Sequence, residues 1–499
     1  MAFPRPQPDL TPNTPAYEQL PLIKPTGFRE YDARWLLGSE INNLGLQAIG
    51  LGLAELFRRR NVPPRLVVGH DFRSYSAGVK HSLISGLLAG GAEVYDIGLA
   101  LSPMAYFAQF ALDVPGVAMV TASHNDNGWT GIKMGMQAPL TFGPDDMQEL
   151  KDIVLAADFA LPGNGQLHMV DDLATRYASD LTENRDPLSR PLKVVCACGN
   201  GTAGAFAPAV LEKLGCEVVP LNCDLDHSFP HHNPNPEDLK MLNAVKEAVQ
   251  AHQADIGLAF DGDGDRCGVV DNTGRPIYAD KIGVLLARDL VKKHGPSTFV
   301  VDVKSTGLFQ TDPELQAHGA ETIYWKTGHS YIKRHCHDTK ALAGFEKSGH
   351  FFFNNPIGRG YDDALMTAIA VLDMLSANPG KTMANLFDSL PPTHQSPTMA
   401  PHCADEQKYD VVARATAYFQ QQAELAGQSV RECITVNGIR IVLADGTWGL
   451  IRASSNKPEL VVVVESPTSE ANMHAMFQAL DAFLSSQPEV GDYNQKLTA

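Results

Sequence analysis

The sequence has 499 residues but no apolar run near the ~20 residues that a bilayer-spanning helix needs. Its Pro-rich start, MAFPRPQPDLTPNTP, lacks the apolar core of a secretory signal and predicts a flexible arm. The net charge is −17, and the basic residues form no run longer than Arg58–Arg60, which argues against a nucleic-acid-binding face. These absences predict a protein that binds neither membrane nor nucleic acid.

Cysteine is also scarce, with eight residues dispersed along the chain. This usage predicts reduced thiols and a cytoplasmic location. Cys196 and Cys198 stand two apart in the strand-like run LKVVCACGN. Two ligands are too few for a metal site, so the sequence favours small buried side chains at both positions.

The composition is that of a globular protein, with 44% hydrophobic and 19% charged residues. Strand-like runs such as RLVVGHD and GVAMVTAS alternate with helix-like stretches such as Ala77–Ala89. This alternation occurs in three successive rounds and predicts α/β units with largely parallel sheets. The last segment differs, because helix-like runs at Glu406–Ala426 and Glu470–Leu484 flank several short strands. It predicts a smaller α+β domain.

The strongest local signal is FDGDGDRCG, in which Asp261, Asp263 and Asp265 alternate with glycines after an apolar run. Alternating carboxylates on extended backbone point the same way and repel one another unless a cation lies among them. Oxygen-only ligands favour Mg²⁺, whereas the spacing does not fit a calcium EF-hand. The alternative to a metal site is an acidic turn whose carboxylates are hydrated. Arg266 follows the carboxylates and could hold them in place or reach a phosphate.

Four further loops carry polar groups. AGFEKSGH could bind sugar hydroxyls, and RASSNKPEL offers cations, hydroxyls and turn backbone for a phosphate. WKTGHS and FREYDAR add cationic and aromatic groups. Each loop alone is typical of an ordinary surface turn or hairpin.

The stretch TASHNDNGW places Ser123 after a strand-like run, where a turn is the safer local interpretation. Together with the distant loops, it fits phosphoryl transfer, which depends mainly on positioning and charge neutralisation. A cation held by the three aspartates would neutralise a phosphate carried on Ser123.

The motifs TASHN, DGDGDR, WKTGHS, EKSGH and WGLIRASSNKP occur in an order that resembles the α-D-phosphohexomutases, in their bacterial phosphomannomutase/phosphoglucomutase branch. The resemblance spans roughly residues 25–470. It implies an α/β fold of four domains around one central cleft, three topologically alike and the fourth α+β. The implied segments are a flexible arm over 1–24, a phosphoserine domain over 25–170, a metal-binding domain over 171–275, a sugar-binding domain over 276–388 and a phosphate-binding domain over 389–499.

The resemblance also implies roles for individual residues. It implies a phosphoserine at Ser123, which also ligates Mg²⁺ together with Asp261, Asp263 and Asp265. Further catalytic positions are His124, Lys133, Arg266, His329 and Arg34. Substrate-binding positions are Tyr31, Lys304, Glu346, Ser348, His350, Arg452, Ser454, Ser455 and Asn456. The implied reaction moves phosphate between O1 and O6 of a hexose, with a hexose 1,6-bisphosphate as intermediate and activator, in a monomer or small homo-oligomer.

Four residues depart from the family pattern. Asp126 stands where proline usually follows SHN, and a carboxylate near a phosphoserine is unfavourable unless it points away. Phe345 replaces the usual glycine before the sugar-loop glutamate, and Asn456 and Lys457 stand where threonine is common.

The sequence leaves three alternatives open. One is a phosphoglucosamine mutase within the same family. A second is a metal-dependent sugar phosphatase with an aspartate nucleophile, which would leave TASHN and RASSNKP without roles. A third is a non-catalytic sugar-phosphate-binding protein, which would need neither Ser123 nor the aspartates.

Overall fold

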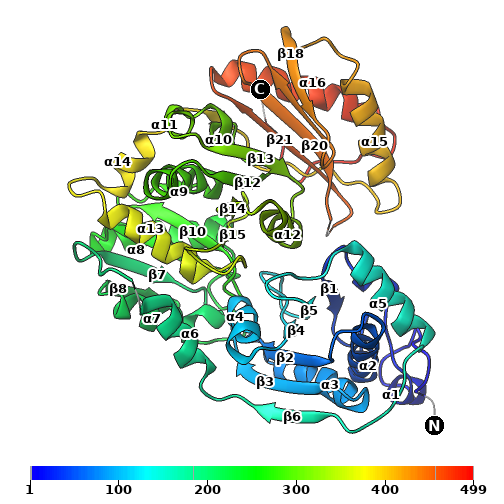
Figure 1. Cartoon of the computed structure of the whole chain (residues 1–499). Helices are drawn as coiled ribbons and strands as arrows, with labels where there is room; N and C mark the ends of the chain where they lie inside the picture. Colours follow the sequence, from blue (N-terminus) through cyan, green and yellow to red (C-terminus); the bar gives the residue numbers. More distant parts are fainter. Residues whose placement is uncertain (1–2, 184, 456, 498–499) are drawn as a thin grey trace. The chain divides into compact units, whose positions relative to one another are not determined.

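A computed structural model describes residues 3–183, 185–455 and 457–497 of the chain (Figure 1). The chain divides into two units. The first unit runs to Ala279 and also includes Ser348–Ala384, and the second holds Asp280–Lys347 and the residues from Asn385 onward.

The first sheet is mixed, in the order β1-β5-β4-β2-β3-β6. Strands β4, β2, β3 and β6 run parallel, whereas β5 is antiparallel to both of its neighbours, β4 and β1. The sequence predicts the parallel centre but not this antiparallel edge. The strands are β1 (Ala33–Leu36), β2 (Arg65–His70), β3 (Glu93–Leu99), β4 (Gly116–Val120), β5 (Trp129–Gly135) and β6 (Gln166–Met169).

Amphipathic helices cover this sheet. Leu46, Ile49, Leu53 and Phe57 recur at helical spacing and are buried in the main core of the first unit. The helices are α2 (Asn43–Arg59), α3 (Ser76–Ala89), α4 (Ser102–Leu112) and α5 (Pro144–Ala156). Helices α2 and α3 lie side by side, and a Cβ at Gly86 in α3 would collide with the backbone of Gln47 in α2 (Figure 1).

The N-terminal segment, for which the sequence predicts a flexible arm, makes specific contacts with this domain. It contains the short helix α1 (Pro15–Gln19), and η1 (Pro25–Gly27) follows directly after it. Asn42 accepts from Leu22 N at 2.9 Å and donates to the carbonyls of Tyr17 and Leu20. Buried Leu22 and Ile23 anchor the end of the segment.

The second sheet of the first unit has the order β11-β10-β9-β7-β8. Strand β7 is parallel to β8 and β9, and β10 returns antiparallel to β9. The acidic loop, residues 261–266, therefore joins two adjacent, fully buried strands. The strands are β7 (Lys193–Ala197), β8 (Glu217–Leu221), β9 (Ile256–Phe260), β10 (Cys267–Asp271) and β11 (Pro276–Ile277). The helices are α6 (Leu173–Thr182), η2 (Thr202–Ala205), α7 (Ala207–Lys213) and α8 (Leu239–His252). The first unit also includes two elements from later in the chain, the buried helix α13 (Ala364–Ser376) and the strand β15 (Phe351–Phe353), which is not part of this sheet.

In the second unit, β12 lies between β13 and β14 and is parallel to both. The strands are β12 (Thr298–Asp302), β13 (Glu321–Trp325) and β14 (Ala343–Phe345). The helices are α9 (Ala279–His294), α10 (Leu308–Thr311), α11 (Pro313–Ala317), α12 (His329–Thr339) and α14 (Met383–Asp388).

The C-terminal sheet is antiparallel in every pairing, in the order β16-β21-β20-β19-β18-β17. Two helices, α15 (Lys408–Phe419) and α16 (Glu470–Ser485), pack against it through a shared core (Figure 1). The strands are β16 (His394–Gln395), β17 (Glu424–Leu425), β18 (Gln428–Ile434), β19 (Ile439–Leu443), β20 (Trp448–Ala453) and β21 (Leu460–Ser466).

One predicted helix in this domain is too long. The sequence predicts a helix over Glu406–Ala426, but α15 ends at Phe419 and Glu424 starts a strand. Ala426 and Gly427 have φ values of 49° and 76°, so they form the left-handed turn of a hairpin. Apolar residues keep a helical spacing through this turn, so the sequence pattern does not show where the helix ends.

The predicted fold class is confirmed, with mixed α/β domains and a C-terminal domain built on an antiparallel sheet. Among the described helices, none combines the length and apolar character of a membrane span.

Candidate active site

Ser123 lies in the β4–β5 connection, in a backbone conformation that is unusual for serine. Its φ is +52°, and the residue is 4% exposed. Left-handed backbone costs a non-glycine residue about 1–2 kcal/mol, so surrounding contacts must hold it. Its hydroxyl oxygen lies 3.1 Å from His124 Nδ1 and 3.3 Å from Asp261 Oδ2. Ser123 therefore faces the acidic loop.

A buried ion pair that the sequence analysis missed supports the Ser123 loop. Arg73 pairs with Asp71 and donates to the carbonyls of Ser123 at 2.9 Å and Asn125 at 2.8 Å. Asp71 also accepts from Ala122 N at 3.1 Å. The sequence carried a signal in DFR, Asp71–Arg73, because these residues directly follow β2 and β2 is the neighbour of β4 in the sheet. These contacts fix the serine by its backbone and leave its hydroxyl oriented toward the carboxylates.

Asp126, one of the residues that depart from the family pattern, is exposed to solvent. Its carboxylate accepts a hydrogen bond from the side chain of Asn233. Hydration and this hydrogen bond both stabilise its negative charge.

The three aspartates of the acidic loop converge. Asp261, Asp263 and Asp265 are fully buried, and each offers a carboxylate oxygen within 4.8 Å of the others. Gly264 turns the loop with a φ of +71°. Asp261 Oδ1 accepts from the backbone N–H groups of Asp265 and Arg266, both at 3.1 Å. The loop therefore presents its carboxylates to one point, as a metal site requires.

Lys133 and Ser102 bind the same carboxylates. Lys133 Nζ donates to Asp263 Oδ2 at 2.7 Å and pairs with Asp265, and Ser102 Oγ donates to Asp263 Oδ2 at 2.7 Å. Burial alone would lower the pKa of Lys133, but the two aspartates raise it well above its usual range. Ser102, the first residue of α4, was not identified from the sequence, since SPM carries no chemical signature.

The donor set fits a hard divalent cation. Asp263 Oδ1 is buried and has no hydrogen-bond partner among the residues that the structure describes. Burial and the charges of Asp265 and Asp263 raise the pKa of Asp261 to about 7. A bound cation would give Asp263 Oδ1 a partner and would reduce the repulsion among the three carboxylates. These residues could therefore hold a metal.

Two basic side chains complete this group. Arg266 Nε donates to Asp261 Oδ2 at 3.2 Å, and Arg266 also pairs with Glu237 at 3.2 Å. Burial, followed by the charges of Arg266 and Arg34, lowers the pKa of His124 well below its usual range. His124 therefore presents a neutral ring to the Ser123 hydroxyl at neutral pH.

Ser348 and His350 also lie at the acidic loop, in the first unit. Arg266 and His350 form a backbone bridge, and His350 Nε2 lies 3.4 Å from Asp265 Oδ1. Ser348 Oγ is 2.9 Å from His350 Nδ1. Asp362, which the sequence analysis did not single out, offers an oxygen within 4.8 Å of the ligand atoms of Asp265 and His350.

Tyr31 and Arg34 come from the edge of the first sheet. Arg34 pairs with Asp32 at 2.8 Å, and Tyr31 is buried. Burial would lower the pKa of Arg34, but Asp32 raises it, and Asp263 contributes in the same direction. Arg34 is thus a permanent cation within electrostatic reach of the acidic loop.

The second unit holds a separate group around β12 and β14. Glu346 Oε1 accepts from Gly328 N at 2.5 Å, next to His329, the first residue of α12. Lys304 Nζ lies 3.8 Å from Asp302 Oδ2. Glu346, His329 and Lys304 are 1%, 5% and 9% exposed. The sequence motif EKSGH is therefore divided, with Glu346 in this group and Ser348 and His350 in the first unit.

The predicted phosphate-binding loop connects β20 to β21. Arg452 and Ser454 are largely buried, and Ser455 is partly exposed. Arg452 Nη1 donates to the carbonyl of Ala453 at 2.7 Å, and Ser454 N donates to Glu459 O at 3.0 Å. Asn456, also predicted here, lies outside the described residues.

Comparison with known families gives four matches in succession. They are the phosphoglucomutase/phosphomannomutase alpha/beta/alpha domain I over residues 25–161, domain II over 175–274, domain III over 278–394, and the C-terminal domain over 402–482. The chain belongs to the phosphoglucomutase/phosphomannomutase family, which are the α-D-phosphohexomutases.

Individual relatives are similar over almost their whole length. A phosphomannomutase/phosphoglucomutase of Pseudomonas aeruginosa is 34% identical over 90% of this chain and 94% of that protein. A phosphoglucomutase of Neisseria meningitidis is 34% identical over 89% of this chain and 94% of that protein. The crystal structure of a phosphoglucomutase/phosphomannomutase family protein from Burkholderia thailandensis has a TM-score of 0.84 at 29% identity, covering 94% of this chain and 99% of that one.

Proposed function

We propose that this chain is a phosphomannomutase/phosphoglucomutase, which moves phosphate reversibly between O1 and O6 of a hexose phosphate. The observation that carries the proposal is the placement of Ser123 Oγ 3.3 Å from Asp261, beside three buried carboxylates that could hold a metal. A hydroxyl beside a divalent-cation site suits a phosphate carrier, because the charge of a phosphoserine needs neutralisation there.

Asp261, Asp263 and Asp265 would hold Mg²⁺, with an oxygen of the phosphorylated Ser123 as a further ligand. When bound, Mg²⁺ neutralises charge on the transferring phosphoryl group. The chain's own residues do the positioning. Arg73 fixes the Ser123 backbone, Lys133 balances the carboxylates, and Arg266 orients Asp261.

The proposed reaction has two phosphoryl transfers. In the first, a hydroxyl oxygen of the hexose phosphate attacks the phosphorus on Ser123. The phosphorus–Oγ bond breaks, Ser123 Oγ takes up a proton, the proton of the attacking hydroxyl passes to a basic group, and a hexose 1,6-bisphosphate forms. The bisphosphate then turns over. In the second transfer, Ser123 Oγ loses its proton and attacks the other phosphate, whose bond to the sugar oxygen breaks; the sugar oxygen takes up a proton, the phosphoserine is restored and the isomer is released. His124, with its neutral ring 3.1 Å from Ser123 Oγ, is placed to exchange a proton there.

The second unit would supply the substrate-binding groups. Glu346 and His329 offer hydrogen-bonding groups for sugar hydroxyls, with Lys304 as a nearby cation. Arg452, Ser454 and Ser455 would bind the phosphate that is not reacting. Such a loop has to accept that phosphate in both orientations of the hexose.

The names of the similar proteins favour mannose and glucose phosphates over glucosamine phosphates. Phosphoglucosamine mutase is the second candidate. A phosphatase with an aspartate nucleophile is disfavoured because Asp263 and Asp265 are paired with Lys133, and Asp261 with Arg266.

The experiment compares the parent protein, Ser123→Ala and the control Ser82→Ala, which removes a hydroxyl from the surface of α3. Each is assayed with mannose 1-phosphate, glucose 1-phosphate and glucosamine 1-phosphate, with Mg²⁺ and a catalytic amount of hexose 1,6-bisphosphate. We expect the parent and the control to isomerise mannose and glucose phosphates, and Ser123→Ala to lose isomerisation. Preference for glucosamine 1-phosphate would assign the second candidate, and bisphosphate-independent release of free phosphate would assign a phosphatase.

A further inference from the structure

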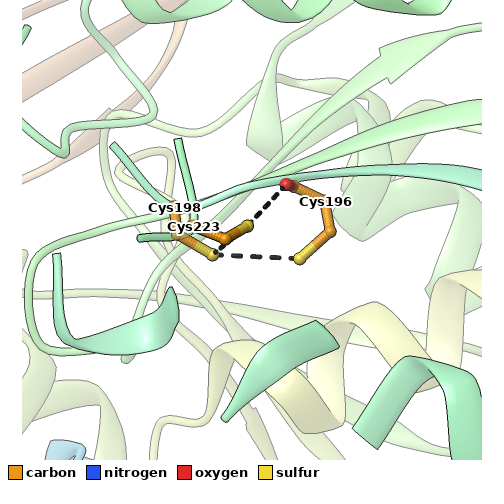
Figure 2. A group of neighbouring side chains, drawn as sticks. All are labelled: Cys196, Cys198 and Cys223. Carbon is orange, nitrogen blue, oxygen red and sulfur yellow. Dashed lines mark hydrogen bonds between the residues drawn. The ribbon is translucent and has the colours of Figure 1, made fainter. Parts of the chain in front are cut away.

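Three cysteine sulfurs converge beside β7, at some distance in sequence from the acidic loop. Cys196 and Cys198 alternate along extended backbone, and their sulfurs are 3.8 Å apart. Cys223, which follows β8, brings its sulfur to 3.5 Å from that of Cys198. All three sulfurs lie within 4.8 Å of one another (Figure 2). The sequence suggested two small buried residues, because nothing along the chain indicated that Cys223 folds against them.

The sulfur separations match those of thiolates that share one metal ion. Two sulfurs bonded to a zinc-sized ion at about 2.3 Å in tetrahedral geometry stand about 3.8 Å apart. The described residues contribute three sulfurs and no fourth group to this cluster. Sulfur ligands select soft cations such as Cu(I), whereas the oxygen ligands of the acidic loop select hard ones. The two sites would therefore bind different classes of ion.

The cluster is held by backbone contacts, and one of its three residues is partly exposed. Cys198 N donates to Leu221 O at 3.1 Å, which ties the end of β7 to the strand that leads to Cys223. Gly204 packs so closely on the carbonyl of Cys223 that a Cβ there would collide with it. Cys196 and Cys198 are fully buried, whereas Cys223 is partly exposed. An incoming ion would meet Cys223 first.

We propose that Cys196, Cys198 and Cys223 form a binding site for a soft, thiophilic metal cation, with Cu(I) as the representative ion. We infer this site from the geometry of the three sulfurs, and the inference does not depend on the mutase reaction. Soft metals bind cysteine as the thiolate, so binding at the three cysteines releases thiol protons. Affinity should consequently increase with pH.

Backbone hydrogen bonds connect the thiol cluster to the acidic loop. Gly201 N donates to Cys198 O at 2.9 Å, and the next residue, Thr202, donates its N–H to Gly262 O at 3.3 Å. Thr202 Oγ1 also accepts from Phe72 N at 2.9 Å. A metal ion at the thiols would fix one end of a short backbone path that ends on the loop of Asp261 and Asp263.

The test titrates the reduced full-length protein with Cu(I), delivered from a competing chelator of known affinity, in the absence of oxygen. We expect one tight equivalent per chain, and X-ray absorption that counts three sulfur neighbours at the copper. Replacing a residue that supports a metal ligand commonly costs 10–100-fold in metal affinity. Cys198→Ser removes a ligand itself, so we expect its Cu(I) affinity to fall about a hundredfold or more. The matched control is Cys216→Ser, which removes a buried thiol of the same domain outside the cluster.

Cys223→Ser provides a second variant whose altered side chain is partly exposed, in case Cys198→Ser folds poorly. Equal Cu(I) affinity in the parent, Cys198→Ser and Cys223→Ser would overturn the proposal, as would a copper centre with fewer than three sulfur neighbours. Loss of the thiols as a Cys198–Cys223 disulfide under these reducing conditions would also overturn it. Greater affinity at higher pH, retained in Cys216→Ser, would support it.

Discussion

The hydroxyl oxygen of Ser123 lies 3.3 Å from Oδ2 of Asp261, a residue 138 positions further along the chain. This contact joins the end of one sheet to the end of another within the first unit. The Ser123 loop depends on Asp71 and Arg73, and the acidic loop depends on Lys133, Ser102 and Arg266. Each of these supporting contacts can be removed by a separate substitution.

Lys133→Met should destabilise the protein by about 3–5 kcal/mol in the absence of divalent cations, since it leaves Asp263 and Asp265 buried without their counter-charge. Mg²⁺ should restore part of the loss, because it supplies positive charge to the same carboxylates. Urea unfolding in EDTA and in Mg²⁺ measures both effects. The exposed pair of Lys292 and Glu314 provides the control, and Lys292→Met should cost less than about 1 kcal/mol in either buffer. Equal effects for the two variants would contradict this assignment.

Gly262→Ala should lower kcat by about a hundredfold with a smaller effect on folding. The added Cβ would collide with the carbonyl oxygen of Ser123, and displacement of a reacting group by about 1 Å can cost that much. Steady-state kinetics and urea unfolding separate the two effects. Gly78→Ala is the matched control, because a Cβ at Gly78 in α3 meets nothing within 4 Å and alanine favours a helix. Unchanged kcat in Gly262→Ala would show that the close approach of the two loops is unimportant for turnover.

Glu465 should make the second unit sensitive to acid. Its buried carboxylate accepts from Lys281 Nζ at 2.7 Å and from Trp448 Nε1 at 2.9 Å. Burial would raise its pKa, but Lys281 and the hydrogen bonds lower it to about 2, from 4.5 in the unfolded chain. Its stabilising effect is therefore fully present above pH 4.5 and is lost as the pH falls toward 2.

Glu465→Gln should accordingly lower the free energy of unfolding by about 3–5 kcal/mol at pH 7, with the difference from the parent shrinking below pH 4.5. The exposed Glu406→Gln serves as the control and should change little. Unfolding curves recorded between pH 7 and the acid limit of folding test the prediction. A difference that stays constant across this range would show that the loss has another cause.

The sequence allowed the fold class and most strands to be predicted, because apolar runs such as Gly116–Val120 and Ile256–Phe260 end at polar loops where β4 and β9 end. It missed the antiparallel position of β5, because residue type does not record strand direction. It also extended a helix through Ala426, since apolar and polar residues keep a helical spacing across the hairpin turn.

The candidate site was predictable where residues of one function are neighbours in sequence, as in the acidic loop. Supporting contacts were not, because they join residues far apart in the chain. Arg73 reaches the carbonyl of Ser123, Ser102 reaches Asp263, and Cys223 completes the thiol cluster. At EKSGH, residues that are adjacent in sequence belong to different units, with Glu346 in the second and Ser348 and His350 in the first.

In the proposed reaction Ser123 carries the phosphate, and direct mapping of that phosphate tests this role. The protein is incubated with Mg²⁺ and hexose 1,6-bisphosphate labelled in both phosphates, digested, and analysed for labelled peptides. We expect one labelled residue, Ser123, whose label passes to unlabelled mannose 1-phosphate or glucose 1-phosphate when these are added. Full isomerisation with no phosphate on Ser123, or with the label on an aspartate of the acidic loop, would contradict it.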